Sequence, residues 1–159
     1  MGSSERPPVE QGQPPRSVLR VVNPVVRALL RSPLHRLLSR EYMLLTVTGR
    51  KTGRSYTIPV GRHEFDGAFV VYAAGGWRHN LRGGADVRLT LDGHERMGHA
   101  ELDEDPARVA QAYKERLDQL GTGKARQLGL KVNLDRSPTA DEIRPAVAGR
   151  AVATIQLAA

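Results

Sequence analysis

Between Leu44 and Val60 the chain reads LLTVTGRKTGRSYTIPV, two extended runs of β-branched and apolar residues joined by a short basic loop. Gly49 and Gly53 permit backbone angles with positive φ and the close approach of a ligand. Three cations share the loop: Arg50, Lys51 and Arg54. Cations and backbone amides gathered at a strand end form an anion site, most naturally for phosphate. A solvated basic hairpin loop explains the same residues equally well.

Familiar phosphate and nucleophile motifs are absent from the sequence. The basic loop lacks the GxxxxGK[ST] spacing of a Walker loop and the GxGxxG pattern of a dinucleotide-binding turn, and a predicted strand follows it. The chain also has no GxSxG motif. Neither a nucleotide-hydrolysing loop nor a serine nucleophile is therefore indicated.

The composition narrows the class of protein. A length of 159 residues predicts one domain with one core. The absence of cysteine excludes disulfides, thiolate metal sites, iron–sulfur clusters and thiol catalysis. The net charge of +7 comes mostly from arginine, but one Trp, four Tyr and two Phe provide few stacking platforms for single-stranded nucleic acid. No signal peptide or membrane span is predicted, so we expect a cytoplasmic protein. Because stacking platforms are few, we expect no binding of nucleic acid.

The first forty residues divide into two segments. Residues 1–15 are rich in Pro, Gly, Ser and Gln and are predicted to be disordered. From Arg16 to Arg40 arginines and apolar residues follow helical spacing, with interruptions at Pro24 and Pro33. We expect this helical segment to cover one face of a sheet, or alternatively to contact anionic lipid or roof an apolar pocket.

The remaining pattern alternates short strands with tight turns. Strands are expected over 43–48, 55–65, 68–74, 87–91, 94–102 and 151–157, with hairpin turns at Asp66-Gly67 and Asp92-Gly93. A helical turn is expected over 77–81. A helix begins after Asp105 and ends at Gly121, and a capping box begins at Thr139. These elements predict an α+β domain around a small antiparallel barrel, spanning residues 16–159.

Two motifs together resemble a known family. The signature Thr-x-Thr-Gly-Arg-Lys-Thr-Gly occupies 46–53, and Trp-x-x-Asn-Leu occupies 77–81 after a glycine break. In this order, with Pro59 between them, they resemble the deazaflavin-dependent nitroreductases, also called the nitroreductase/quinone reductase family. The resemblance implies a split antiparallel β-barrel. It also implies binding of coenzyme F420, a phosphorylated deazaflavin with an oligoglutamate tail.

The resemblance further implies which residues contact the coenzyme. The phosphate and tail would be held by the basic loop, here Arg50, Lys51, Thr52 and the neighbouring Arg54. The following strand would line the cofactor with Tyr56, Thr57, Ile58, Pro59, Val60 and Gly61. Backbone groups facing the ring would come from Tyr72, Ala73, Ala74 and Gly75. The Trp-x-x-Asn segment would complete the site with Gly76, Trp77, Arg78, His79 and Asn80.

The expected activity is hydride transfer from reduced coenzyme F420 to a small organic acceptor. Many members have Ser-Lys where this chain has Ala74-Gly75, and the C-terminal tyrosines of some nitro-reducing members have no counterpart. A quinone or an activated alkene is therefore preferred over a nitro compound as acceptor. No catalytic side chain is assigned, although His79 lies inside the second motif.

Several alternatives stay open at this point. The five histidines have no spacing typical of metal ligands, so no metal is expected. The same barrel could hold flavin mononucleotide (FMN), or carry apolar ligands or lipids without catalysis. The arginine-rich helical segment could contact a membrane peripherally. The protein is expected to be a monomer or a homodimer.

Overall fold

The computed structural model describes residues 6–12, 28, 32 and 40–159. The helical segment expected over 16–40 lies almost entirely outside these residues. The chain divides into two compact units, which we call the helical unit (Met1–Gln13 with Asp103–Ala151) and the barrel unit (Pro14–Leu102 with Val152–Ala159). Two compact units need not unfold independently, so the single domain predicted for 16–159 stays a prediction.

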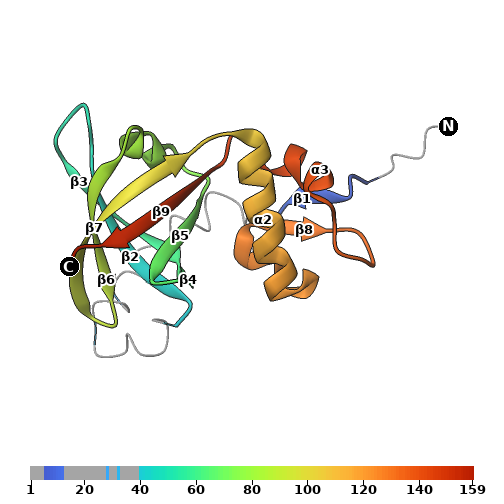
Figure 1. Ribbon diagram of the computed structural model, residues 1–159, viewed down its shortest axis with the longest axis horizontal. Helices are drawn as coiled ribbons and strands as arrows, with labels where there is room; N and C mark the ends of the chain where they lie inside the picture. Colours follow the sequence, from blue (N-terminus) through green and yellow to red (C-terminus); the bar gives the residue numbers. More distant parts are fainter. Residues whose placement is uncertain (1–5, 13–27, 29–31, 33–39) are drawn as a thin grey trace. The chain divides into compact units, whose positions relative to one another are not determined.

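The barrel unit is built on a seven-stranded, mostly antiparallel sheet with the order β3-β2-β6-β7-β9-β5-β4. Its strands are β2 (Tyr42–Thr48), β3 (Ser55–Gly61), β4 (His63–Phe65), β5 (Ala68–Ala73), β6 (Ala85–Leu91), β7 (His94–Asp103) and β9 (Ala151–Leu157). The two edge strands, β3 and β4, follow one another in the chain with only Arg62 between them. The sheet must therefore curl to bring its edges together, as Figure 1 shows. The predicted α+β split barrel is confirmed.

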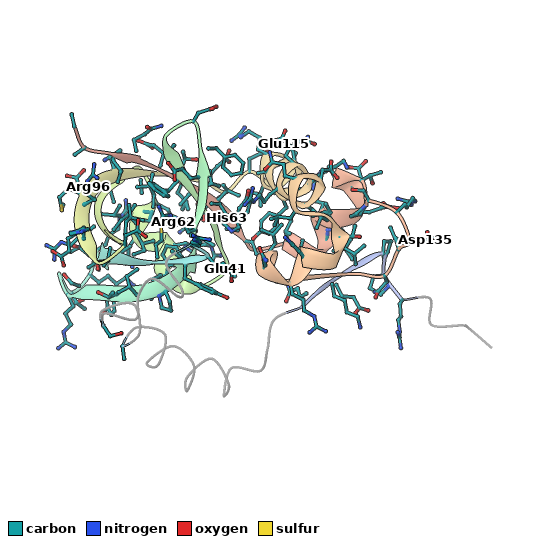
Figure 2. The ribbon with its side chains drawn as sticks, turned by 90° about the horizontal axis from the view of Figure 1, so that it is seen from below. Glu41, Arg62, His63, Arg96, Glu115 and Asp135 are labelled. Atoms are coloured by element: carbon teal, nitrogen blue, oxygen red, sulfur yellow. The ribbon has the colours of Figure 1, made fainter. Side chains whose placement is uncertain are left out.

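The break at Arg62 corrects the single strand expected over 55–65. The Arg62 N–H donates to the Glu41 carbonyl at 2.8 Å, which continues the register of β3 with β2 by one residue beyond the end of β3. Its guanidinium lies 3.1 Å from Asp92 Oδ1, and the next residue, His63, is buried. Figure 2 labels Arg62 and His63 at this junction. Gly61 is the last residue of β3, directly before this break, and the expectation of one strand over 55–65 passed over it.

The two Asp-Gly hairpin turns form as predicted. Asp66 and Gly67 have φ of 49° and 78°, and Asp92 and Gly93 have φ of 51° and 80°. A two-residue hairpin turn that matches the right-handed twist of its strands requires positive φ at both residues. These turns set the registers of β4 with β5 and of β6 with β7.

The inside of the sheet is an aliphatic core. Met43, Leu45 and Val47 of β2 are fully buried in it, and register places them opposite Val60, Ile58 and Tyr56 of β3. Side chains opposite one another on paired strands share a face of the sheet. Tyr56 therefore lies on the core face at the loop end of the hairpin, whereas Thr57 and Pro59 face the other way.

The helical unit forms around α2 (Pro106–Leu120), whose termini follow the predicted signals. The Asp105 carboxylate accepts the Arg108 N–H at 3.0 Å, and the Gly121 N–H donates to the Leu117 carbonyl. The capping box at Thr139 opens α3 (Ala140–Ile143). The 3₁₀ turns η3 (Thr122–Leu128) and η4 (Arg144–Val147) complete the unit. Its buried core includes Val109, Tyr113, Leu117, Leu128 and Ile143.

The disorder predicted for residues 1–15 is wrong for the part that the structure describes. Val9–Gln11 form β1, which pairs antiparallel with β8 (Leu130–Val132). Val9 is buried, and the Gly12 N–H donates to the Gly129 carbonyl at 3.0 Å. This pairing crosses more than a hundred positions of the chain, so the local Pro- and Gln-rich composition could not reveal it.

No helix among the described residues is long and apolar enough to cross a membrane.

Candidate functional site

The basic loop of residues 49–54 is a defined turn at the end of the β2–β3 hairpin. The Gly49 N–H donates to the Arg54 carbonyl at 2.7 Å, and the Gly53 N–H donates to the Gly49 carbonyl at 2.9 Å. Gly53 takes φ of 69°, a conformation that favours glycine. The Arg54 N–H donates to the Thr52 hydroxyl at 3.3 Å. The loop is thus held by hydrogen bonds among its own residues, and its cationic side chains are exposed.

The second motif forms the 3₁₀ turn η2 (Gly76–Leu81), anchored in the barrel unit by the fully buried Leu81. The Arg78 guanidinium folds back along this turn and donates to the Gly75 carbonyl at 2.9 Å. Asn80 Nδ2 donates to the Trp77 carbonyl at 3.1 Å. Arg78 is therefore used in holding the turn, whereas Trp77 and His79 remain part of its surface.

A side-chain bond joins the basic loop to the 3₁₀ turn. The Arg50 N–H donates to Asn80 Oδ1 at 3.1 Å, across thirty positions of sequence. The same Asn80 amide holds the Trp77 carbonyl. The two motifs of the family resemblance are thus brought into contact by one residue.

A cavity of about 570 Å³ opens between the loop and the turn. Sequence-predicted residues that line it are Arg50, Lys51, Thr52, Tyr56, Gly76, Trp77, His79 and Asn80. Gly49 and Arg82 also line it and were not among the predicted site residues. Gly49 belongs to the same signature, so the motif already contained the signal. Arg82 lies just past the Trp-x-x-Asn-Leu motif, and no local pattern marks it.

The other predicted site residues lie outside the cavity lining. They are Arg54, Thr57, Ile58, Pro59, Val60, Gly61, Tyr72, Ala73, Ala74, Gly75 and Arg78. Their contact with a cofactor stays a prediction.

Strand alternation and packing explain several of these positions. Ile58 and Val60 pack against the core, and Ala73 is buried in it. Thr57 faces outward and lines a separate groove of about 360 Å³, where its hydroxyl lies 2.9 Å from that of Thr46. Tyr72 packs edge-on against His63, with ring centroids 5.0 Å apart. The family pattern predicts a run of contacts, but a strand presents only alternate side chains to one face.

The loop cations carry positive charge that the described part of the chain does not neutralise. Within residues 6–12, 28, 32 and 40–159, the side chains of Arg50, Lys51 and Arg54 form no ion pair. Cations elsewhere do: Arg62 pairs with Asp92, Arg108 with Asp103, Lys114 with Asp118 and Arg136 with Glu142. Arg50 and Lys51 therefore present two uncompensated charges to the cavity, which suits an anion of more than one charge.

Two aromatic rings give the cavity flat apolar surfaces, and glycines make room for them. Tyr56 is 44% exposed although it lies on the core face of β3. A Cβ at Gly49 would lie 2.8 Å from Tyr56 Cε2, and one at Gly75 would lie 2.7 Å from Trp77 Cδ1. Any larger residue at either position would displace the ring. A Cβ at Gly76 would meet nothing within 4 Å.

The described histidines, His63, His79, His94 and His99, do not assemble a metal site. No group of His, Asp and Glu side chains capable of holding a metal occurs among the described residues. His99, on β7, lies between two carboxylates, 3.0 Å from Asp86 Oδ1 and 2.9 Å from Glu101 Oε1. The hydrogen bond to Asp86, followed by that to Glu101, raises the pKa of His99. This exposed cluster is not part of the cavity lining.

Comparisons with known proteins agree with the motifs. A family model described as F420H(2)-dependent quinone reductase matches residues 19–133. A comparison with curated proteins finds no match.

Among solved structures, one described as a domain-swapped dimer is 19% identical. The match covers 90% of this chain and all of that one, with a TM-score of 0.48. An F420-H2-dependent reductase, FDR-A, is 18% identical over 72% of this chain and 94% of its own, with a TM-score of 0.45.

Proposed function

The chain belongs to the F420H(2)-dependent quinone reductase family, and from this premise we propose that it transfers a hydride from reduced coenzyme F420 to a quinone. The family makes it an oxidoreductase and makes coenzyme F420, rather than FMN, its cofactor. The choice of acceptor and the residues that hold the cofactor are parts of the proposal. The observation that carries them is the cavity of about 570 Å³ that joins Trp77 to Arg50 and Lys51, two cations that form no ion pair with any described residue.

The residues of this cavity fit the coenzyme in both charge and shape. Coenzyme F420 combines a flat deazaflavin ring with a phosphate and an oligoglutamate tail. Arg50 and Lys51 offer charge-assisted hydrogen bonds to anionic oxygens, and Arg82 adds a third cation to the lining. Tyr56 and Trp77 offer apolar faces of the kind that flat ligands require. Gly76, where even a Cβ would meet nothing, leaves backbone open to close approach.

Each group of residues then has a distinct role in the proposed site. Arg50, Lys51 and Thr52 hold the anionic part of the coenzyme. Tyr56 and Trp77 orient the ring and limit water around it. When bound in its reduced form, the coenzyme supplies a hydride, so the chain needs no nucleophile or metal of its own.

Reduction of a quinone to a hydroquinone consumes one hydride and one proton. Imidazole is the side chain best suited to exchange a proton near neutral pH, and His79 lines the cavity. We therefore assign His79 as the candidate proton donor. Replacing His79 with Asn should slow the steady-state reduction of the quinone by a larger factor than it weakens coenzyme binding.

A small flat acceptor is the class that the cavity lining favours. The cavity lining combines aromatic and glycine surface beside the cations, and a quinone or an activated alkene can lie against an aromatic face without needing a charged partner. A nitro compound is placed last because the chain lacks the C-terminal tyrosines found in some nitro-reducing relatives, and the quinone is placed first because the matching family model is described by that acceptor.

The proposal is tested by mixing the purified full chain with reduced coenzyme F420 and, in parallel, a soluble quinone, an activated alkene and a nitroaromatic compound. Oxidation of the coenzyme is followed by its absorbance and fluorescence. We expect oxidation to be fastest with the quinone. Oxidation with none of the three, despite saturable coenzyme binding, would contradict the proposed reaction.

A further inference from the structure

We infer that Asn80 is a positioning residue whose side chain holds the basic loop to the 3₁₀ turn η2. We call its two hydrogen bonds, to the Arg50 N–H and to the Trp77 carbonyl, the clasp. Its amide makes two bonds in opposite directions: Oδ1 accepts the Arg50 N–H at 3.1 Å, and Nδ2 donates to the Trp77 carbonyl at 3.1 Å. Asparagine is suited to this task because one planar group supplies an acceptor and a donor. The clasp can be tested without a cofactor, whereas its effect on coenzyme binding rests on the proposed function.

The clasp sets which loop groups are available to an anion. The Arg50 N–H is occupied by Asn80 and is therefore not a donor to a bound phosphate. Fixing this N–H also fixes the Cα of Arg50, from which the guanidinium extends toward Gly83. A Cβ built on Gly83 would lie 3.6 Å from Arg50 Nη2. Asn80 thus orients the cation by holding its backbone.

The surrounding contacts show why the loop needs this restraint. The internal bonds of the loop close its own turn but do not attach it to η2. Among the described residues, the hydrogen bond from Arg50 to Asn80 is the one that attaches the loop to the turn. Asn80 is half-buried, and the turn η2 to which it belongs is anchored by the buried Leu81. Without Asn80 the loop would be tethered only through its flanking strands.

Two substitutions separate the halves of the clasp. Asn80→Ala removes both bonds. Asn80→Asp keeps an oxygen that accepts the Arg50 N–H but loses the donor to the Trp77 carbonyl. Asn133→Ala is a matched control from the helical unit, because Asn133 Nδ2 holds the Pro7 carbonyl in the same manner at 2.8 Å.

The first measurement is amide hydrogen exchange of the Arg50 N–H by NMR, on the full chain without cofactor. In Asn80→Ala this amide should exchange about fivefold to tenfold faster than in the wild type, the effect of losing one neutral hydrogen bond. Asn80→Asp should restore protection, and Asn133→Ala should leave it unchanged. An unchanged Arg50 exchange rate in folded Asn80→Ala would overturn the clasp, as would loss of protection in a folded Asn80→Asp.

The second measurement uses Trp77, the only tryptophan of the chain. Both Asn80 variants lose the bond to its carbonyl, so both should shift the tryptophan emission, whereas Asn133→Ala should not. Unchanged emission in both Asn80 variants would overturn this half of the clasp.

The third measurement links the clasp to catalysis. Because Asn80 acts on loop position and not on reacting atoms, Asn80→Ala should raise the KM for coenzyme F420 about fivefold to tenfold and leave kcat within about twofold. A fall in kcat with an unchanged KM would contradict a positioning role. If the wild type fails to bind the coenzyme, the proposed function fails while the exchange measurement still decides the clasp.

Discussion

Removing Arg50 and Lys51 together should abolish tight coenzyme binding without unfolding the protein. Each side chain is exposed and unpaired among the described residues, and each is expected to make a charge-assisted contact with an anionic oxygen. Such contacts contribute about 1.5–3 kcal/mol each. Exposure to solvent places both at the lower end of this range. The double substitution to Ala should therefore cost about 3 kcal/mol, or roughly a hundredfold in Kd.

Fluorescence titration of the wild type and of Arg50→Ala/Lys51→Ala with coenzyme F420 checks this value. Raising the salt concentration should weaken wild-type binding and have less effect on the variant, since salt screens the same contacts. The midpoint of urea unfolding should change little, because exposed loop substitutions usually fall within about 0.5 kcal/mol.

A matched control removes the same charge elsewhere. Lys124 and Arg126 lie exposed in the helical unit, and Lys124→Ala/Arg126→Ala lowers the net charge equally. This control should bind the coenzyme like the wild type. If both double variants lose affinity alike, only the net charge matters. If the loop variant binds within about threefold of the wild type, the loop is a solvated hairpin and not an anion site.

Three further predictions address the glycines, a helix cap and an ion pair. Gly49→Ala should lower the midpoint of urea unfolding because its Cβ would lie 2.8 Å from the ring of Tyr56, whereas Gly76→Ala should leave that midpoint unchanged because its Cβ would meet nothing within 4 Å; equal urea midpoints for the two variants would contradict this. Asp105→Ala should lower the free energy of unfolding by about 1 kcal/mol, since it removes the N-cap of α2, and Asp105→Asn should recover most of the loss. The hydrogen bond from Arg136 lowers the pKa of Glu142 from 4.5 to about 2. The ion pair between Arg136 and Glu142 therefore stabilises the folded state above about pH 4.5, and this contribution is lost as the pH falls through 2. The difference in urea midpoint between the wild type and Glu142→Gln should accordingly shrink as the pH is lowered, and a constant difference would argue against the ion pair.

Local signals in the sequence account for most of the fold. Asp66-Gly67 and Asp92-Gly93 predicted both hairpins because the backbone angles of such turns depend on those residues alone. The helix start at Asp105 and the capping box at Thr139 were predicted for the same reason, since a cap bonds within its own turn. Each of these features is decided by residues a few positions apart.

The parts that escaped prediction depend on distant residues. The pairing of β1 with β8 buries Val9 against a strand that lies far along the chain, and no neighbour of Val9 signals it. The break at Arg62 follows from the need to join the two edges of a curled sheet. The link from Arg50 to Asn80, thirty positions apart, is likewise a property of the folded chain.

The candidate site shows the same division. The motifs identified the loop and the Trp77 turn, and the structure places them around one cavity. Arg82 lies on the lining without any sequence signal, because its place depends on where the 3₁₀ turn ends. The ring of Tyr72 packs on His63, and the expected contact of its backbone with the coenzyme stays a prediction.

Several expectations from the sequence stay predictions. They are the cytoplasmic location, the monomeric or homodimeric state and the peripheral membrane contact. The helical segment on which the membrane contact depends lies outside the described residues. Binding to anionic vesicles at low salt, and its loss when residues 1–31 are deleted, would test that contact.

We propose that the cavity between the basic loop and Trp77 binds both the anionic part and the deazaflavin ring of coenzyme F420. The most direct test titrates the full chain with coenzyme F420, with the same deazaflavin lacking the phosphate and tail, and with FMN, following quenching of the single tryptophan. We expect every one of these ligands that binds to quench the tryptophan, with coenzyme F420 bound most tightly and the tailless deazaflavin bound at least tenfold more weakly. Equal affinities for coenzyme F420 and its tailless form, or tighter binding of FMN, would contradict it.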